Sequence, residues 1–137
     1  MTDSKKLSQE RYSQLTEGYV KSETHAKGYD LDRLFELADP QPEWSVLDVA
    51  TGGGHTALKI APAVKQMTVT DLTPEMLAAA EAHLTEKGIT NAVYRVADAE
   101  NLPLEDNTFD LVTCRIAPHH FPDAFKFVQE CERVLQP

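Results

Sequence analysis

Apolar residues follow two alternating spacings along the chain, which predicts strands that take turns with helices. Short apolar runs predict strands at residues 45–50, 66–72, 92–97 and 109–116. Apolar positions three and four residues apart predict helices at residues 30–39, 55–65 and 73–87, and a last helix that begins after Asp123. We expect Pro62 to interrupt the second helix, Thr73 to cap the third, and Gly88 to end it.

Strands that alternate with helices favour a mostly parallel sheet with right-handed crossovers. Only residues 98–108 join the third and fourth predicted strands. In a sheet of order 3-2-1-4 this link must cross roughly 14 Å between strands and return roughly 17 Å along them. A link of about eleven residues can extend to about 36 Å. We therefore predict an α/β fold with a doubly wound parallel sheet of order 3-2-1-4, whose ligands bind beyond the carboxyl ends of the strands.

Composition and charge narrow the classes of partner. The chain has 137 residues, enough for one domain with a modest core. Its 13 Lys+Arg against 22 Asp+Glu give a formal charge of −9, which disfavours nucleic acid as a binding partner.

No apolar run has the length of a membrane span, and residues 1–14 lack the apolar core of a signal peptide. Cys114 and Cys131 show neither metal-ligand nor redox spacing, so we expect reduced thiols in a cytoplasmic protein without a metal site.

Three glycines join the first predicted strand to the next helix, in the segment VLDVATGGGHTA at residues 46–57. Glycine lets a ligand approach the backbone, and the helix N-terminus adds free N–H groups. The glycines also fit the dinucleotide pattern G-x-G-x-x-A, with Asp71 about 20 residues further on. A pyrophosphate would, however, lie near Asp48, and like charges 6 Å apart repel by about 2.8 kcal/mol at an effective dielectric of 20. The same carboxylate attracts the ammonium and sulfonium of S-adenosylmethionine, which carries no phosphate.

Two further acids follow predicted strands on the same edge. Asp71 closes the second strand, where a carboxylate can accept both hydroxyls of a ribose. Asp98 closes the third, where it can accept from an adenine amino group. Either could instead only cap the following helix. Asp48 lies inside an apolar strand, where a purely structural carboxylate would need a specific partner, so we expect it to contact the ligand.

Four segments in order resemble the motifs of class I S-adenosylmethionine-dependent methyltransferases: VLDVATGGG, TDLTPEML, VADAENLPLEDNTFDLVTCRIAPHHF and CERVLQP. The resemblance covers roughly residues 20–137 and is strongest for the small-molecule branch that includes ubiquinone and menaquinone biosynthesis enzymes. It implies a Rossmann-like fold, S-adenosyl-L-methionine as cofactor, and methyl transfer to a small-molecule acceptor. Family members continue past a segment like residues 133–137 into a glycine pair and three more strands. We therefore expect an incomplete Rossmann-like domain at residues 30–137, with a helical segment at residues 1–29 that covers the site.

The resemblance also implies roles for individual residues. The cofactor contacts of the family correspond here to Asp48, Ala50, Gly52, Gly53 and Gly54 for the methionine part, Asp71, Leu72 and Met76 for the adenosine, Asp98 and Ala99 for the adenine edge, and Arg115 and Ile116 for the floor beneath the sulfonium. Tyr19 could close over the cofactor or only anchor a helix. The family usually has glycine where Ala50 stands. His120 or His119 could serve as a general base, as could His25, although relatives also use such His pairs for packing alone.

Three functions remain open at this point: a small-molecule methyltransferase, a non-catalytic S-adenosylmethionine-binding module, and an NAD(P)-dependent oxidoreductase, which Asp48 disfavours. The fourth predicted strand would form an edge with unpaired backbone groups. We expect this edge to pair with another chain, as in a homodimer, or to be covered by a rearranged segment or by polypeptide beyond Pro137.

Overall fold

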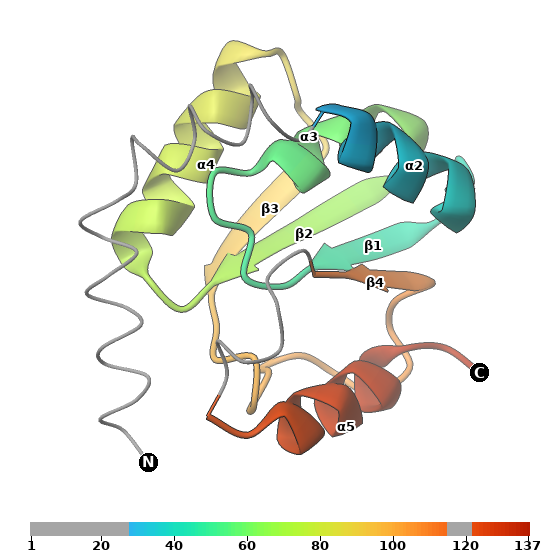
Figure 1. The fold of residues 1–137 in the computed structure, drawn as a ribbon, viewed down its shortest axis with the longest axis vertical. Coiled ribbons are helices and arrows are strands. Elements are labelled where there is room, and N and C mark those ends of the chain that lie inside the picture. Colours follow the sequence, from blue (N-terminus) through green and yellow to red (C-terminus); the bar gives the residue numbers. More distant parts are fainter. Residues whose placement is uncertain (1–27, 115–121) are drawn as a thin grey trace.

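The computed structural model describes residues 28–114 and 122–137, which are arranged around one parallel sheet (Figure 1). Its strands are β1 (Ser45–Asp48), β2 (Gln66–Asp71), β3 (Ala92–Val96) and β4 (Leu111–Thr113). They lie in the order β3-β2-β1-β4, and every neighbouring pair is parallel. The predicted doubly wound order is therefore confirmed, and the carboxyl ends of all the strands meet at one edge.

Helices cover both faces of the sheet (Figure 1). The helices α2 (Gly28–Ala38), α3 (His55–Ile60) and α4 (Pro74–Glu86) lie on one face, and α5 (Ala124–Val134) lies on the other. The 3-10 turn η1 (Ala61–Ala63) follows α3, because Pro62 has no backbone N–H with which to continue an α-helix. The predicted interruption at Pro62 is thus confirmed. Among the described residues, no helix combines the length and the hydropathy that a bilayer span requires.

Strand β1 is buried on both sides and separates two apolar cores. Val46 faces the first core, where it is packed with Met67 of β2 and Leu84 of α4. Leu47 faces the second core, which Phe109 and Val134 complete. A strand that is covered on both faces carries a continuous apolar run, which explains why its sequence shows no polar alternation.

The short link between β3 and β4 is held by side chains of α5. The guanidinium of Arg133 donates to the carbonyl oxygens of Leu102 at 2.9 Å and Leu104 at 2.8 Å, and to the carboxylate of Asp106 at 2.7 Å. The carboxylate of Glu130 accepts the N–H of Leu102 at 2.7 Å. Because these side chains satisfy backbone groups of the link, the link needs no helix of its own.

Element boundaries differ from the prediction at all four strands: β2 and β3 each end one residue earlier than predicted, and the differences are larger at β1 and β4. Strand β4 was expected over residues 109–116 but spans Leu111–Thr113. Its start is later because Phe109 instead forms an isolated parallel bridge with Leu135, and residues 115 and 116 of the expected strand lie outside the described residues. Strand β1 ends at Asp48 rather than at residue 50, because Ala50 takes a left-handed conformation with φ of 55°. The expected helical segment at residues 1–29 falls almost entirely outside the described residues.

Replacing Ala50 with glycine should raise the free energy of unfolding by about 0.5 to 1 kcal/mol. A residue with a side chain is strained by about 1–2 kcal/mol in the left-handed region, and glycine avoids this strain. Glycine in turn costs about 0.5–1 kcal/mol, because its backbone loses more conformational freedom on folding. Chemical denaturation measures the change. In the control Ala78→Gly, on the exposed side of α4, the same exchange should cost about 1 kcal/mol. A loss of stability in both variants would contradict a strained Ala50.

Candidate functional site

Asp48 ends β1 with its carboxylate buried between two hydroxyl donors. Only 1% of the residue is exposed. Thr51 Oγ1 donates to Oδ2 at 2.6 Å, and Thr113 Oγ1 donates to Oδ1 at 2.7 Å. Thr113 stands opposite Asp48 in the register of β1 and β4. The specific partners that burial of this carboxylate requires therefore include two threonines, through which Asp48 joins the glycine loop to β4.

Asp71 ends β2 and binds the glycine loop through its carboxylate. Its Oδ2 accepts the N–H of Gly52 at 2.9 Å, and its Oδ1 accepts the N–H of Thr73 at 2.9 Å. Burial raises the pKa of this carboxyl, and the backbone hydrogen bonds from Thr73, Gly52 and Leu72 offset only part of the rise. Each carboxylate oxygen has a further lone pair with which to accept a hydroxyl from a ligand.

Thr73 occupies the N-cap position of α4, as predicted, but its hydroxyl makes no cap hydrogen bond. Thr73 Oγ1 is buried and has no hydrogen-bond partner in the part of the chain that the structure describes. The neighbouring carboxylate of Asp71 takes the backbone N–H of Thr73 instead. This end of α4 is thus organised by the acid that ends β2.

The glycine loop, residues 50–54, is fixed to the sheet by backbone hydrogen bonds. The N–H of Thr51 donates to the carbonyl oxygen of Thr70 at 2.9 Å, and the N–H of Gly54 donates to that of Thr51 at 3.0 Å. Gly54 has φ of 84°, and a Cβ added to it would lie 2.9 Å from Leu84 Cδ1 and 3.1 Å from Ala80 Cβ. Gly54 is therefore needed because α4 approaches the loop closely. The sequence alone could not distinguish this packing role from contact with a ligand.

Two histidines that the sequence analysis did not single out lie beside this loop. Nδ1 of His83, in the last turn of α4, is 3.1 Å from the carbonyl oxygen of Gly53. The ring of His83 packs edge-to-face against that of His55, with 4.8 Å between the centroids. His55 is the first residue of α3 and is 7% exposed. A helical position 30 residues from the loop carries no local sequence signal of such a contact.

The remaining expected cofactor contacts are found around the same edge or lie outside the described residues. Asp98 is half-buried after β3, and its Oδ1 accepts the N–H of Glu100 at 2.9 Å. Ala50 and Leu72 are half-buried, whereas Met76 and Ala99 are buried. Outside the described residues lie Tyr19, His25, Arg115, Ile116, His119 and His120. In the described part of the chain, no three His, Cys, Asp or Glu residues are grouped so that they could hold a metal ion.

Taken together, the edge holds buried carboxylates at the ends of β1 and β2, a half-buried carboxylate just after β3, and the buried backbone of Gly52–Gly54. This set consists mainly of hydrogen-bond acceptors with negative charge. It suits a ligand that carries positive charge and hydroxyl groups, and it opposes a pyrophosphate.

Comparison with known proteins finds similar sequences and structures over most of the chain. A family described as "Methyltransferase domain" matches residues 47–137. The uncharacterized methyltransferase YcgJ of Bacillus subtilis is 40% identical over 125 residues, which are 91% of this chain and 49% of YcgJ. The crystal structure of YcgJ superposes with a TM-score of 0.76 at 41% identity, covering 79% of this chain and 46% of that one.

Two further similar proteins are named for two different reactions. The ubiquinone/menaquinone biosynthesis C-methyltransferase UbiE of Rickettsia bellii is 36% identical over 105 residues, which are 72% of this chain and 42% of UbiE. The crystal structure of the [4+2]-cyclase SpnF has a TM-score of 0.70 at 28% identity, and it matches 77% of this chain and 42% of its own. The chain thus spans about half the length of the curated relatives it matches.

Proposed function

This chain belongs to the methyltransferase domain family, and from that premise we propose that it binds S-adenosyl-L-methionine at the carboxyl edge of its sheet for methyl transfer to a small-molecule acceptor. The observation that carries the proposal is the placement of two buried carboxylates, Asp48 and Asp71, against one glycine loop. The name of UbiE, a quinone-pathway C-methyltransferase, supports a small-molecule acceptor.

In this proposal the strand ends divide the cofactor between them. Asp48 and the backbone of Gly52 and Gly53 hold the methionine part, whose ammonium is attracted by the carboxylate. Asp71 accepts hydrogen bonds from the ribose, and Asp98 accepts from the adenine amino group. Leu72, Met76 and Ala99 supply the apolar surroundings of the adenosine. Arg115 and Ile116 are proposed as contacts on the family resemblance alone, and Tyr19 as a residue of the N-terminal segment that closes over the cofactor.

The chain contributes orientation more than chemistry. When bound, S-adenosylmethionine supplies a methyl group on a sulfonium, which a nucleophile can displace in line. The loop is already tied to β2 through Thr70 and Asp71, so the strand ends can hold the reacting carbon in one place. We propose that an imidazole nitrogen of His120 or His119, which follow β4 in sequence, takes a proton from the acceptor.

Isothermal titration calorimetry tests the choice of cofactor. We expect S-adenosylmethionine and its product S-adenosylhomocysteine to bind with micromolar dissociation constants and one site per chain. NADH should release no binding heat, because its pyrophosphate would approach Asp48. Binding of NADH without binding of S-adenosylhomocysteine would overturn the proposal and favour an oxidoreductase.

A second candidate function is a module that binds S-adenosylmethionine without transferring its methyl group. It is favoured by the similarity to SpnF, which is named as a [4+2]-cyclase rather than as a methyltransferase. Formation of S-adenosylhomocysteine with candidate acceptors separates the two functions. Unchanged turnover in the His119→Ala/His120→Ala double variant would exclude a general base at these positions.

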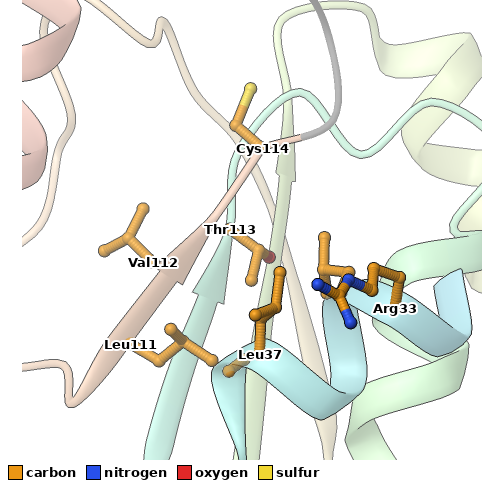
Figure 2. A pocket seen from close by; sticks show the side chains of 8 residues that line it. Arg33, Leu37, Leu111, Val112, Thr113 and Cys114 are labelled. Atoms are coloured by element: carbon orange, nitrogen blue, oxygen red, sulfur yellow. The ribbon is translucent and has the colours of Figure 1, made fainter. Parts of the chain in front are cut away.

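We also propose that the outer edge of β4 pairs with a second copy of the chain. Among the described residues β4 pairs only with β1, and an open strand edge offers N–H and C=O groups to another strand. A cavity of about 530 Å³ adjoins this edge between α2 and β4. Figure 2 shows Leu111 of β4 pointing toward Leu37 of α2, whereas Val112 points to the other face of the sheet. Leu37 is 71% exposed, which makes this surface apolar and accessible.

Sedimentation velocity tests this pairing. We expect the wild-type chain to sediment as a concentration-dependent dimer and Leu37→Lys as a monomer, because a charge would be buried in the interface. Phe125→Lys is the control and should remain dimeric, because Phe125 is also 71% exposed and lies in α5, on the opposite face of the sheet. A wild-type chain that is monomeric at high concentration would contradict the proposal.

A further inference from the structure

We infer that His83 is a positioning residue that holds the Gly53–Gly54 peptide of the glycine loop through its Nδ1–H. The inference rests on the proposed function, because this loop is the proposed cofactor contact. Nδ1 lies 3.1 Å from the carbonyl oxygen of Gly53. A carbonyl oxygen can only accept a hydrogen bond, so Nδ1 must carry a proton in this arrangement.

The hydrogen bond from His83 matters because the peptide group is held on both sides. The carbonyl of Gly53 and the N–H of Gly54 belong to one planar unit and point in opposite directions. On the other side, the N–H of Gly54 donates to the carbonyl oxygen of Thr51 at 3.0 Å. Between two glycines such a plane rotates at low cost, since glycine accepts positive and negative φ alike. The imidazole therefore supplies a restraint that the glycine backbone lacks.

The imidazole is itself held in place. It is half-buried, and its ring stands at 67° to the ring of His55, at a centroid distance of 4.8 Å. The next residue, Leu84, is fully buried against Gly54. The last turn of α4 thus contacts Gly53 by a hydrogen bond and Gly54 by packing, so the loop and α4 are fixed relative to each other.

These contacts fix the loop before any ligand arrives. Gly52 is bound to Asp71 of β2, and Gly53 is bound to His83 of α4. A loop that is already ordered loses less conformational freedom when it binds, which raises affinity without a new ligand contact. Loss of the Nδ1–H should therefore loosen the Gly53–Gly54 peptide and weaken cofactor binding together.

The test compares three replacements of His83 by two measurements. Asparagine places an amide N–H near the position of Nδ1, glutamine places it near Nε2, and leucine keeps bulk without a donor. Amide hydrogen exchange at Gly54 reports on the loop, and calorimetry reports the dissociation constant for S-adenosylhomocysteine. Glu86→Gln, an exposed change in the same turn of α4, is the control.

We expect His83→Leu and His83→Gln to speed exchange at Gly54 and to weaken binding by about threefold to tenfold each, the equivalent of one neutral hydrogen bond. His83→Asn and Glu86→Gln should match the wild type. Unchanged amide exchange at Gly54 in His83→Gln would overturn the inference, as would a His83→Asn variant whose exchange and affinity do not match the wild type. The comparison of glutamine with asparagine stands even if the leucine variant does not fold.

Failure of the inference and failure of the proposed function give different results. If the wild type binds and His83→Gln binds equally well, the inference is overturned and the proposed function stands. If the wild type binds no S-adenosylhomocysteine, the proposed function fails. Exchange at Gly54 then decides alone whether His83 positions the peptide.

Discussion

Replacing Gly54 with alanine should lower the free energy of unfolding by about 2 to 4 kcal/mol. The added methyl would lie 2.9 Å from Leu84 Cδ1, 3.1 Å from Ala80 Cβ and 3.3 Å from Ala80 Cα, so α4 would have to move away from the loop. The residue also has φ of 84°, where a side chain is strained. Both costs act on the folded state, and chemical denaturation measures their sum.

Gly88 provides a matched control for this substitution. Its φ of 83° is nearly the same, but a Cβ there would meet nothing within 4 Å. Gly88→Ala should therefore cost only the backbone strain, about 1–2 kcal/mol. The difference between the two variants isolates the packing of α4 on the loop. Equal losses of stability would show that this packing does not require glycine at position 54.

Replacing Asp48 with asparagine should weaken binding of S-adenosylmethionine by about tenfold to a hundredfold. Removing one charge about 6 Å from a cationic group costs up to about 2.8 kcal/mol at an effective dielectric of 20, and solvent screening reduces this. The carboxamide keeps the shape of the side chain, and its partners Thr51 and Thr113 have hydroxyls that can either donate or accept. The fold should therefore survive, and calorimetry should show the loss of affinity.

Thr113→Val separates the charge of Asp48 from its structural contacts. The variant removes one donor to a buried carboxylate, so we expect a loss of stability of about 1.5–3 kcal/mol. The charge remains, so affinity for S-adenosylmethionine should stay within about threefold of the wild type. If Asp48→Asn binds as well as the wild type, Asp48 serves only to join the glycine loop to β4.

The sequence predicted what depends on local pattern. The spacing of apolar residues predicted the strands and helices, and Pro62 predicted the break after α3. The short link after β3 was compatible with the observed sheet order. Asp71 was found because it closes an apolar run, and Asp48 because it interrupts one; the two runs become neighbouring strands. These features depend on residues close together in the chain.

Features that depend on register and on packing between elements could not be predicted in the same way. Thr113 becomes a partner of Asp48 only through the alignment of β4 with β1, 65 residues apart. The different roles of Gly53 and Gly54 appear only when α4 is packed on the loop, since one binds His83 and the other makes room for Leu84. Strand β4 begins only at Leu111 because Phe109 bridges to Leu135, which no local pattern indicates.

Titration of isotopically labelled chain with S-adenosylhomocysteine, followed by amide NMR shifts, tests most directly whether the carboxyl edge of the sheet is the cofactor site. We expect the largest shift changes at Gly52, Gly53, Leu72 and Ala99, which surround this edge in the structure. Residues of the cavity between α2 and β4, such as Leu37 and Leu111, should not respond. Shift changes confined to that cavity, or none at saturating ligand, would contradict a cofactor site at the strand ends.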